Sequence, residues 1–264
     1  MSDGRAVRVA DGTLLSATVS GDGSPLVLVH GTTGSKAAWA MVVPLLVEHH
    51  TVWAYDRRGR GQSGDGAQYS LEHEIQDLEA IVDAAGAGCH VCGHSFGGTL
   101  VLEAAARRDD LSSVVVYEPV VHPAAAEEPT RRALGLLNRD DVEGALAVFL
   151  SEVAGLSGDE IAIVRSMPEI WERMLDTAPT ITREVKALMG GSWEPARYRS
   201  LTAPLLLLRG GDTRSPIYPS IDEMTSAVPH AESFTLSGQR HLAAAFAPEM
   251  FAEVVLQFTK RPTS

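Results

Sequence analysis

Ser95 occupies the centre of the segment Gly93-His94-Ser95-Phe96-Gly97, which matches the pattern Gly-x-Ser-x-Gly. The pattern follows a strand-like run that ends at Cys92 and precedes an apolar, helix-like run. A sharp turn from strand to helix needs glycine on both sides of its central residue, because a side chain there would collide with the neighbouring backbone. Such a turn leaves a hydroxyl exposed at a helix N-terminus, where the amide dipoles stabilise developing negative charge. We therefore expect Ser95 to be a nucleophile; the alternative is a glycine-flanked helix cap.

A serine hydroxyl needs a general base, and His241 is the histidine that the order of elements favours. It stands in the loop after the last predicted strand, Ser233 to Leu236, and directly precedes the C-terminal helix. In a parallel sheet this position lies at the carboxyl end of the strands, beside the Ser95 turn. We expect His241 to be the base, the alternative being an ordinary solvated loop histidine.

A carboxylate must hold the base in the right tautomer and stabilise the imidazolium that forms. Asp212 follows the continuously apolar run Leu205 to Leu208 and lies in a glycine-rich turn that frees its side chain. Glu118 is the rival acid, because it directly follows another apolar run, Val114 to Tyr117. We favour Asp212, since the acid commonly precedes the histidine by one strand and one helix. An aspartate that only caps its own turn is the structural alternative.

An oxyanion hole needs two backbone N–H donors near the nucleophile. One is expected from Phe96, the residue after the nucleophile, and the other from the loop His30-Gly31-Thr32-Thr33-Gly34. We assign the second donor to the amide of Thr32, with Thr33 as the alternative. His30 is expected to tie down this loop rather than to move protons. His30 and Thr33 are also candidate contacts for the substrate.

The elements that position these residues alternate between short apolar runs and longer amphipathic stretches, which is typical of βαβ units and predicts an α/β fold. An Asp-Gly turn at residues 10–13 separates the first two strands, so the sheet is expected to begin antiparallel. The predicted strands are Ala6–Val9, Leu14–Val19, Leu26–Val29, Thr51–Tyr55, His90–Cys92, Val114–Tyr117, Leu205–Leu208 and Ser233–Leu236. The predicted helices around them are Ala38–Glu48, Leu71–Ala85, Phe96–Arg107, Ser220–Val228 and Pro248–Lys260.

The alternation stops over residues 122–200, where successive helices are expected. We interpret this stretch as a helical cap inserted into a core formed by residues 1–121 and 201–264. Trp171, Met174 and Trp193 are candidate contacts for an apolar substrate, although packing between helices is the more common use of such residues. The expected cap helices are Thr130–Asn138, Asp140–Ala154, Ser157–Asp176 and Ile181–Met189.

The order of these motifs resembles that of the α/β-hydrolase fold family, and the resemblance covers the whole chain outside the expected cap. It implies an eight-stranded, mostly parallel twisted sheet flanked by helices, a cap inserted after the sixth strand, and a Ser-His-Asp triad beneath the cap. The motifs that carry it are His30-Gly31, Asp56 to Ser63, Gly93 to Gly97, Gly211-Asp212 and His241. The Asp56 to Ser63 stretch corresponds to a structural turn and is given no catalytic role.

Within that fold, serine at the turn implies acyl transfer, whereas the epoxide hydrolases and haloalkane dehalogenases that the chain also resembles use aspartate there. The leading hypothesis is a serine hydrolase that cleaves a small carboxylic ester, lactone or related acyl substrate through an acyl-enzyme on Ser95. One alternative is a relative that cleaves C–C bonds, decarboxylates, cyclises or perhydrolyses with the same triad. Another is a ligand-binding relative without turnover.

The composition narrows the class of partner. A net charge of −12 disfavours nucleic acid and anionic membranes, both of which attract clusters of lysine and arginine, so a small-molecule substrate is expected. The first residues lack a signal-peptide pattern, and no apolar run approaches the roughly 20 residues of a membrane span, so we expect a cytoplasmic protein. The high content of alanine, arginine and glycine is typical of bacterial proteins from GC-rich genomes.

Cofactor chemistry is not expected from this sequence. Cys89 and Cys92 lie three residues apart in a strand-like run, so their side chains should face opposite ways and form neither a disulfide nor a metal pair. A phosphate-cradling glycine loop and a cluster of metal ligands are both missing from the pattern, so neither a cofactor nor a metal is predicted.

Overall fold

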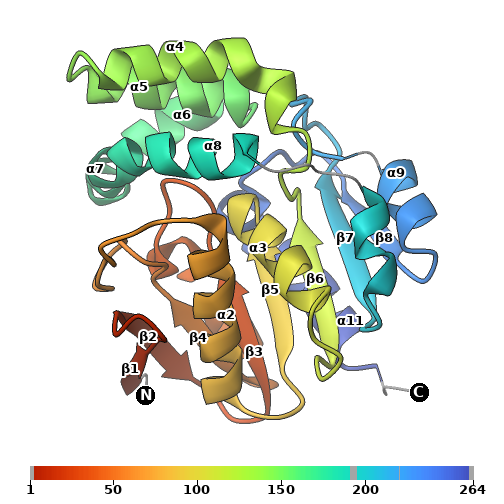
Figure 1. The fold of residues 1–264 in the computed structure, drawn as a ribbon. Coiled ribbons are helices and arrows are strands. Elements are labelled where there is room, and N and C mark those ends of the chain that lie inside the picture. Colours follow the sequence, from red (N-terminus) through yellow and green to blue (C-terminus); the bar gives the residue numbers. More distant parts are fainter. Residues whose placement is uncertain (1–2, 191–194, 220, 262–264) are drawn as a thin grey trace.

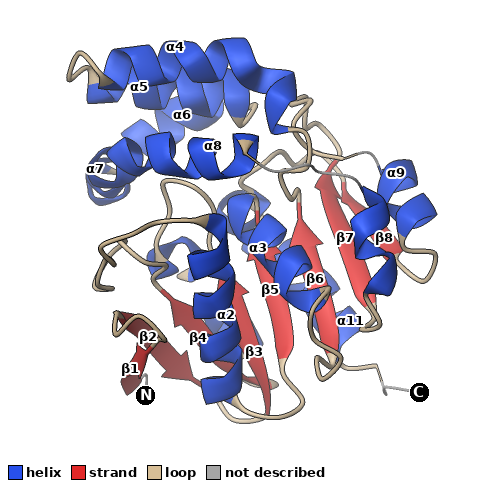
Figure 2. Cartoon of the chain, viewed as in Figure 1, coloured by secondary structure: helices blue, strands red, loops and turns tan. Residues whose placement is uncertain are grey.

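The computed structural model describes residues 3–190, 195–219 and 221–261. Eight strands in this part of the chain form a sheet in the order β1-β2-β4-β3-β5-β6-β7-β8, with helices on both faces (Figures 1 and 2). β2 pairs antiparallel with both β1 and β4, and the other pairs are parallel, which confirms the predicted fold class. The strands are β1 Asp3–Arg8, β2 Leu14–Ser20, β3 Ser24–Val29, β4 His50–Tyr55, β5 His90–His94, β6 Ser113–Tyr117, β7 Leu205–Gly210 and β8 Glu232–Leu236.

The central strands are apolar without interruption because helices cover the sheet on both sides. Side chains alternate across the pleat, so Leu207 and Leu208 of β7 belong to two different hydrophobic cores. Cys89 and Cys92 also lie in opposite cores, and both thiols are free. Helices α2, α3 and α9 pack into one core and α1, α10 and α11 into the other. Their bounds are α1 Val43–Leu46, α2 Leu71–Ala85, α3 Phe96–Ala105, α9 Ile221–Ala227, α10 Ala243–Phe246 and α11 Pro248–Thr259.

Between β6 and β7 the chain forms a stack of helices above the carboxyl ends of the strands (Figure 1). We call α4 to α8 the inserted helices. The last turn of α5 passes into a π-helical turn, Phe149–Val153. The bounds are α4 Glu127–Leu137, α5 Val142–Val148, α6 Gly158–Arg165, α7 Pro168–Thr177 and α8 Ile181–Met189.

Two stretches that were each expected to form one helix are divided in the structure, and a proline explains each division. The stretch 157–176 was expected to be one helix, but it divides into α6 and α7 because Pro168 cannot continue a helix and instead begins one. The stretch 38–48 likewise divides into a 3₁₀ turn, Lys36–Trp39, and the short α1, which has Pro44 in its first turn. The short helix α10 was not expected. Among the residues described above, none of the helices is long and apolar enough to cross a membrane.

Candidate active site

Ser95 stands at the junction of β5 and α3, with backbone angles φ 55° and ψ −124°. A positive φ is costly for a residue with a side chain and is found where the surrounding structure enforces it, commonly at functional sites. Here the enforcement is the close packing of the turn: a Cβ on Gly93 would lie 2.5 Å from the carbonyl oxygen of Gly97, and a Cβ on Gly97 would collide with that of Val29. The Gly-x-Ser-x-Gly pattern thus encodes a strained turn that presents the serine.

The loop after β3 approaches this turn from the neighbouring strand. A Cβ on Gly31 would lie 2.9 Å from the Cβ of Ser95, so only glycine allows the approach. Thr32 and Ser95 then line the same pocket. Within the described residues, the backbone amides of Thr32 and Phe96 donate no hydrogen bond to any protein acceptor. Two free amides beside the serine are what an oxyanion hole requires.

His30 holds the loop in place. Its Nε2 accepts a hydrogen bond from the backbone N–H of Arg57 at 3.1 Å, and its Nδ1 donates to the carbonyl oxygen of Gly31 at 2.9 Å. Burial, with the nearby charge of Arg57, lowers the pKa of His30 well below its ordinary value, so the ring is neutral. His30 does not border the pocket, and neither does Thr33, whose hydroxyl donates to the carbonyl oxygen of Thr32.

His241 lies after β8, and its Nδ1 donates a hydrogen bond to the carboxylate of Glu118, at 2.7 Å from Oε2. The other oxygen of Glu118 accepts the backbone N–H of Gly210 at 2.8 Å, which fixes the carboxylate. Glu118 is almost completely buried and, like Ser95, has a positive φ, 48°. The tautomer with the proton on Nδ1 leaves Nε2 of His241 as an acceptor.

The expectation that Asp212 would be the partner of His241 is therefore wrong. Asp212 lies in the turn after β7, where its backbone N–H donates to the carbonyl oxygen of Gln239 and its side chain is exposed. Glu118 directly follows the neighbouring strand β6, and its carboxylate contacts His241 from there. Both residues follow apolar strands, and the contact with His241 is made by the one after β6.

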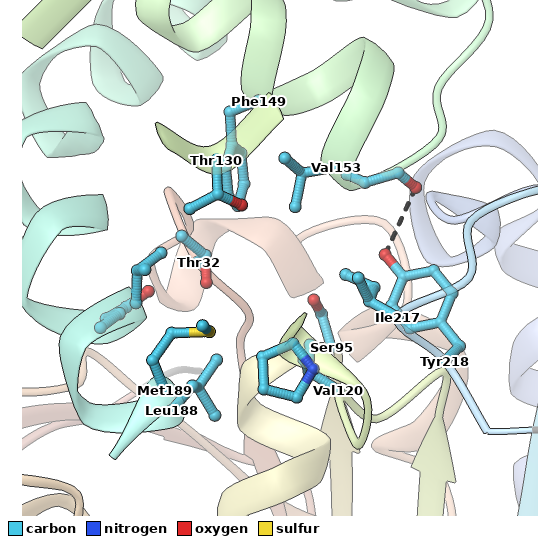
Figure 3. A pocket seen from close by; sticks show the side chains of 14 residues that line it. Thr32, Ser95, Val120, Thr130, Phe149, Val153, Leu188, Met189, Ile217 and Tyr218 are labelled. Carbon is cyan, nitrogen blue, oxygen red and sulfur yellow. Dashed lines mark hydrogen bonds between the residues drawn. The ribbon is translucent and has the colours of Figure 1, made fainter. Parts of the chain in front are cut away.

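Tyr218 was not singled out from the sequence, yet its hydroxyl lies 3.0 Å from Nε2 of His241. The two rings are stacked, with centroids 4.7 Å apart. The hydroxyl also lies 3.3 Å from the carbonyl oxygen of Ala154, which follows α5 (Figure 3). Burial and the charge of Glu118 raise the pKa of Tyr218 well above its ordinary value, while a hydrogen bond from Ser95 opposes this shift. Tyr218 is thus a neutral hydroxyl in contact with His241, and it borders the same pocket as Ser95.

His94, in the variable position before the serine, supports His241 from the other side. The two rings lie 4.4 Å apart, and Nε2 of His94 donates to the backbone carbonyl oxygen of His241 at 2.8 Å. Burial, together with the nearby His241, lowers the pKa of His94 well below its ordinary value. A neutral His94 positions the base without competing with it for a proton.

The serine projects into a pocket between the sheet and the inserted helices, with about 490 Å³ of empty space including its mouth (Figure 3). The wall is largely apolar, and Thr32, Thr130, Glu184 and Tyr218 are its polar members besides Ser95. The apolar side chains are Val120, Pro123, Phe149, Val153, Ala154, Val185, Leu188, Met189 and Ile217.

Among the residues predicted to contact substrate from the inserted segment, Trp171 and Met174 pack in the hydrophobic core and do not border the pocket. Trp193 lies outside the described residues. The wall instead comes from the π-helical turn after α5, from α8 and from the segment around Ile217. Helical periodicity marked these residues as apolar but could not show which of them would face the serine.

The chemistry that this arrangement can perform is acid–base catalysis around one serine. A buried carboxylate, a histidine with a fixed tautomer, and free amides surround the hydroxyl. In residues 3–190, 195–219 and 221–261, histidine, cysteine and acidic side chains form no group of three that could hold a metal ion.

Comparison with known proteins shows the family to which the chain belongs. Residues 26–254 match the model of the alpha/beta hydrolase family. An alpha/beta hydrolase from Sphaerobacter thermophilus DSM 20745 superposes with a TM-score of 0.82 at 35% identity, covering 96% of this chain and 99% of that one. The enol-lactonase from Burkholderia xenovorans LB400 has a similar fold, with a TM-score of 0.81 at 20% identity over 97% of this chain and 100% of that one.

A relative with a named substrate is (E)-2-((N-methylformamido)methylene)succinate hydrolase from Acinetobacter baylyi (strain ATCC 33305 / BD413 / ADP1). It is 23% identical over 240 residues, which are 87% of this chain and 88% of that protein. The family match, which spans most of the sequence and contains the serine turn, Glu118 and His241, identifies the chain as a member of the α/β hydrolase family.

Proposed function

We propose that this α/β hydrolase cleaves a small carboxylic ester, lactone or related acyl substrate through an acyl-enzyme on Ser95, with His241 as the base and Glu118 as the acid that orients it. The observation that carries the proposal is the series of hydrogen bonds from Glu118 through His241 to Tyr218, which lines an apolar pocket together with Ser95. A serine so placed is the nucleophile of acyl transfer.

In the first step Ser95 Oγ bonds to the acyl carbon, the carbonyl π electrons move to its oxygen, and His241 takes up the serine proton. Glu118 stabilises the imidazolium without accepting its proton. Collapse of the tetrahedral intermediate breaks the bond to the leaving oxygen, which takes the proton from His241. A water molecule, deprotonated by His241, then attacks the acyl carbon. Collapse of this second intermediate breaks the bond to Ser95 Oγ, which takes the proton back from His241, and releases the acid.

The proton from Ser95 reaches His241 through the Tyr218 hydroxyl. Tyr218 accepts the serine proton as it donates its own to Nε2, so a phenolate never accumulates, in keeping with its raised pKa. The amides of Phe96 and Thr32 bind the oxyanion, since both are free and both flank Ser95. The inserted helices serve as the cap, because α8 and the turn after α5 supply the pocket wall opposite the serine.

The pocket indicates a substrate with a short apolar portion. Its volume suits a small molecule, and its wall offers mostly aliphatic side chains. Catalysis by this site needs no cofactor. The name of the Burkholderia relative, an enol-lactonase, is compatible with acyl cleavage of this kind.

Hydrolysis of p-nitrophenyl esters of graded chain length tests the proposal. We expect turnover that falls as the acyl chain outgrows the pocket, and loss of turnover in Ser95→Ala with the circular dichroism spectrum unchanged. Equal rates in the wild type and Ser95→Ala would overturn it. Binding of acyl compounds without turnover by the folded wild type would favour a ligand-binding relative instead.

A further inference from the structure

Glu184, on α8, is a buried carboxylate that borders the pocket of Ser95. Its side chain is 1% exposed. One oxygen, Oε1, accepts hydrogen bonds from the guanidinium groups of Arg57 and Arg60. The other oxygen, Oε2, has no hydrogen bond of normal geometry among the described residues, and the Thr32 hydroxyl is a donor nearby. A buried polar atom without a partner is uncommon in proteins and calls for an explanation.

The carboxylate is charged at neutral pH. Burial alone would raise the pKa of Glu184, but the positive charges of Arg57 and Arg60 and the nearby Thr32 hydroxyl outweigh it, so the pKa is lowered. Arg57 is also paired with a second carboxylate, that of Glu74. The two positive charges of the arginines therefore balance the two negative charges of Glu74 and Glu184. A charged carboxylate oxygen can only accept hydrogen bonds, and leaving it without a donor is costly.

The free oxygen belongs to a residue of the pocket wall. Glu184 shares the pocket wall with Thr32, whose amide is the proposed oxyanion donor, and with Ser95. The neighbouring wall residues on the same helix, Val185, Leu188 and Met189, are apolar and offer no hydrogen bond through their side chains. A polar group of the substrate that faces α8 therefore meets the Glu184 carboxylate.

We propose that Glu184 is a specificity-determining residue, which accepts a hydrogen bond from a neutral O–H or N–H group of an otherwise apolar acyl substrate. The preferred substrates are then hydroxy- or amido-substituted esters or lactones rather than plain alkyl ones. This inference rests on the proposed hydrolysis at Ser95 and adds the substrate class to it.

Matched substrates test the inference in the wild-type enzyme. The positional isomers of methyl hydroxybutanoate are compared with their O-methyl ethers and with methyl butanoate, and acid release is followed at constant pH. At least one hydroxy ester should exceed both its ether and methyl butanoate in kcat/KM by about tenfold, as expected for one hydrogen bond to a charged group. Equal kcat/KM values for all of these esters would overturn the inference.

The variant Glu184→Gln assigns that preference to the carboxylate. Glutamine can keep a carbonyl oxygen towards the arginines while placing an N–H donor where Oε2 stood. The ratio of kcat/KM for the preferred hydroxy ester to that for its ether should then fall about tenfold. An unchanged ratio, with all esters slowed alike, would mean that Glu184 only anchors the arginines.

Glu74→Gln is the matched control, because Glu74 binds the same Arg57 but does not border the pocket. It should leave the ratio unchanged whatever it does to stability. Failure of this inference remains distinct from failure of the proposed function: hydrolysis of methyl butanoate that depends on Ser95 tests the latter alone.

Discussion

Oε2 of Glu118 lies 2.7 Å from Nδ1 of His241, although 123 positions separate the two residues in the chain. Glu118 follows β6, whereas Asp212, the carboxylate favoured by the order of motifs, follows β7 and is exposed. The two strands are neighbours in the sheet, so their carboxyl ends offer alternative positions for an acid beside the same histidine. In this protein the carboxylate in contact with His241 is that of Glu118, directly after β6.

Removing the charge of Glu118 should therefore damage catalysis far more than removing that of Asp212. We expect Glu118→Gln to lower kcat by roughly 10³-fold or more, because the imidazolium loses its counter-charge and the tautomer is no longer fixed. Asp212→Asn should stay within about twofold of the wild type. Steady-state kinetics on one p-nitrophenyl ester make the comparison, and the reverse ranking of the two variants would restore Asp212 as the acid.

Tyr218→Phe tests the proton relay. Phenylalanine keeps the stacking on His241 but removes the hydroxyl between Ser95 and Nε2. We expect kcat to fall by about tenfold or more, since a positioned proton-transfer group commonly contributes at least that much. Tyr198→Phe is the control, because Tyr198 is also buried but bonds to Glu103. A Tyr218→Phe variant as fast as the wild type would show that Ser95 reaches His241 directly.

Gly31→Ala tests whether the loop after β3 supplies an oxyanion donor. The added methyl would stand 2.9 Å from the Cβ of Ser95, so the loop must retreat and carry the amide of Thr32 with it. Loss of one oxyanion donor costs on the order of 10²-fold in kcat. Gly135→Ala is the control, because Gly135 lies on α4 with no atom near the new methyl group. It should leave kcat unchanged. Full activity of Gly31→Ala would argue against an oxyanion donor in this loop.

Because several histidines are buried and neutral, we expect the free energy of unfolding to fall on mild acidification. Burial lowers the pKa values of His30 and His94 well below normal, and burial with the nearby His50 lowers that of His90 to about 4. Their folded-state pKa values are depressed, so the unfolded chain binds more protons than the folded one below the ordinary value of 6.5. The free energy of unfolding should accordingly fall as pH drops from about 6.5 towards 4, by about 1.4 kcal/mol per pH unit for each histidine.

Urea unfolding between pH 7.5 and pH 5 measures this slope (roughly the window in which histidine titrates). His90→Gln removes one of the four buried histidines whose pKa is lowered (His30, His50, His90 and His94), at a site remote from Ser95, so its slope should be shallower by about one proton. A free energy of unfolding that rises on acidification would contradict the assignment of neutral, buried rings.

The fold could be predicted because its signals are local. Continuous apolar runs indicated parallel strands, and the Asp-Gly turn indicated an antiparallel start; the sheet has both. The turn around Ser95 could also be predicted, since its close packing leaves no room for a Cβ at Gly93 or Gly97 and so requires the two glycines of the pattern. The helix boundaries failed where a proline, such as Pro168, interrupts an otherwise continuous amphipathic pattern.

The partners of these residues were less predictable, because they depend on contacts between distant segments. Glu118 and Asp212 have the same local signature, a carboxylate just after an apolar strand, and only the register of β6 and β7 decides between them. Tyr218 and Glu184 carry no motif at all. Their importance arises from hydrogen bonds to His241 and from the cluster with Arg57, which no spacing in the sequence reveals.

The activation of Ser95 through His241 and Glu118 is tested most directly by the rate at which a fluorophosphonate probe adds to the protein. Intact-protein mass follows this addition. We expect one adduct on the wild type, none on Ser95→Ala or His241→Ala, strongly slowed addition to Glu118→Gln, and a wild-type rate for Asp212→Asn. Labelling of Ser95→Ala at the wild-type rate, or of Glu118→Gln as fast as the wild type, would contradict a serine activated through His241 and Glu118.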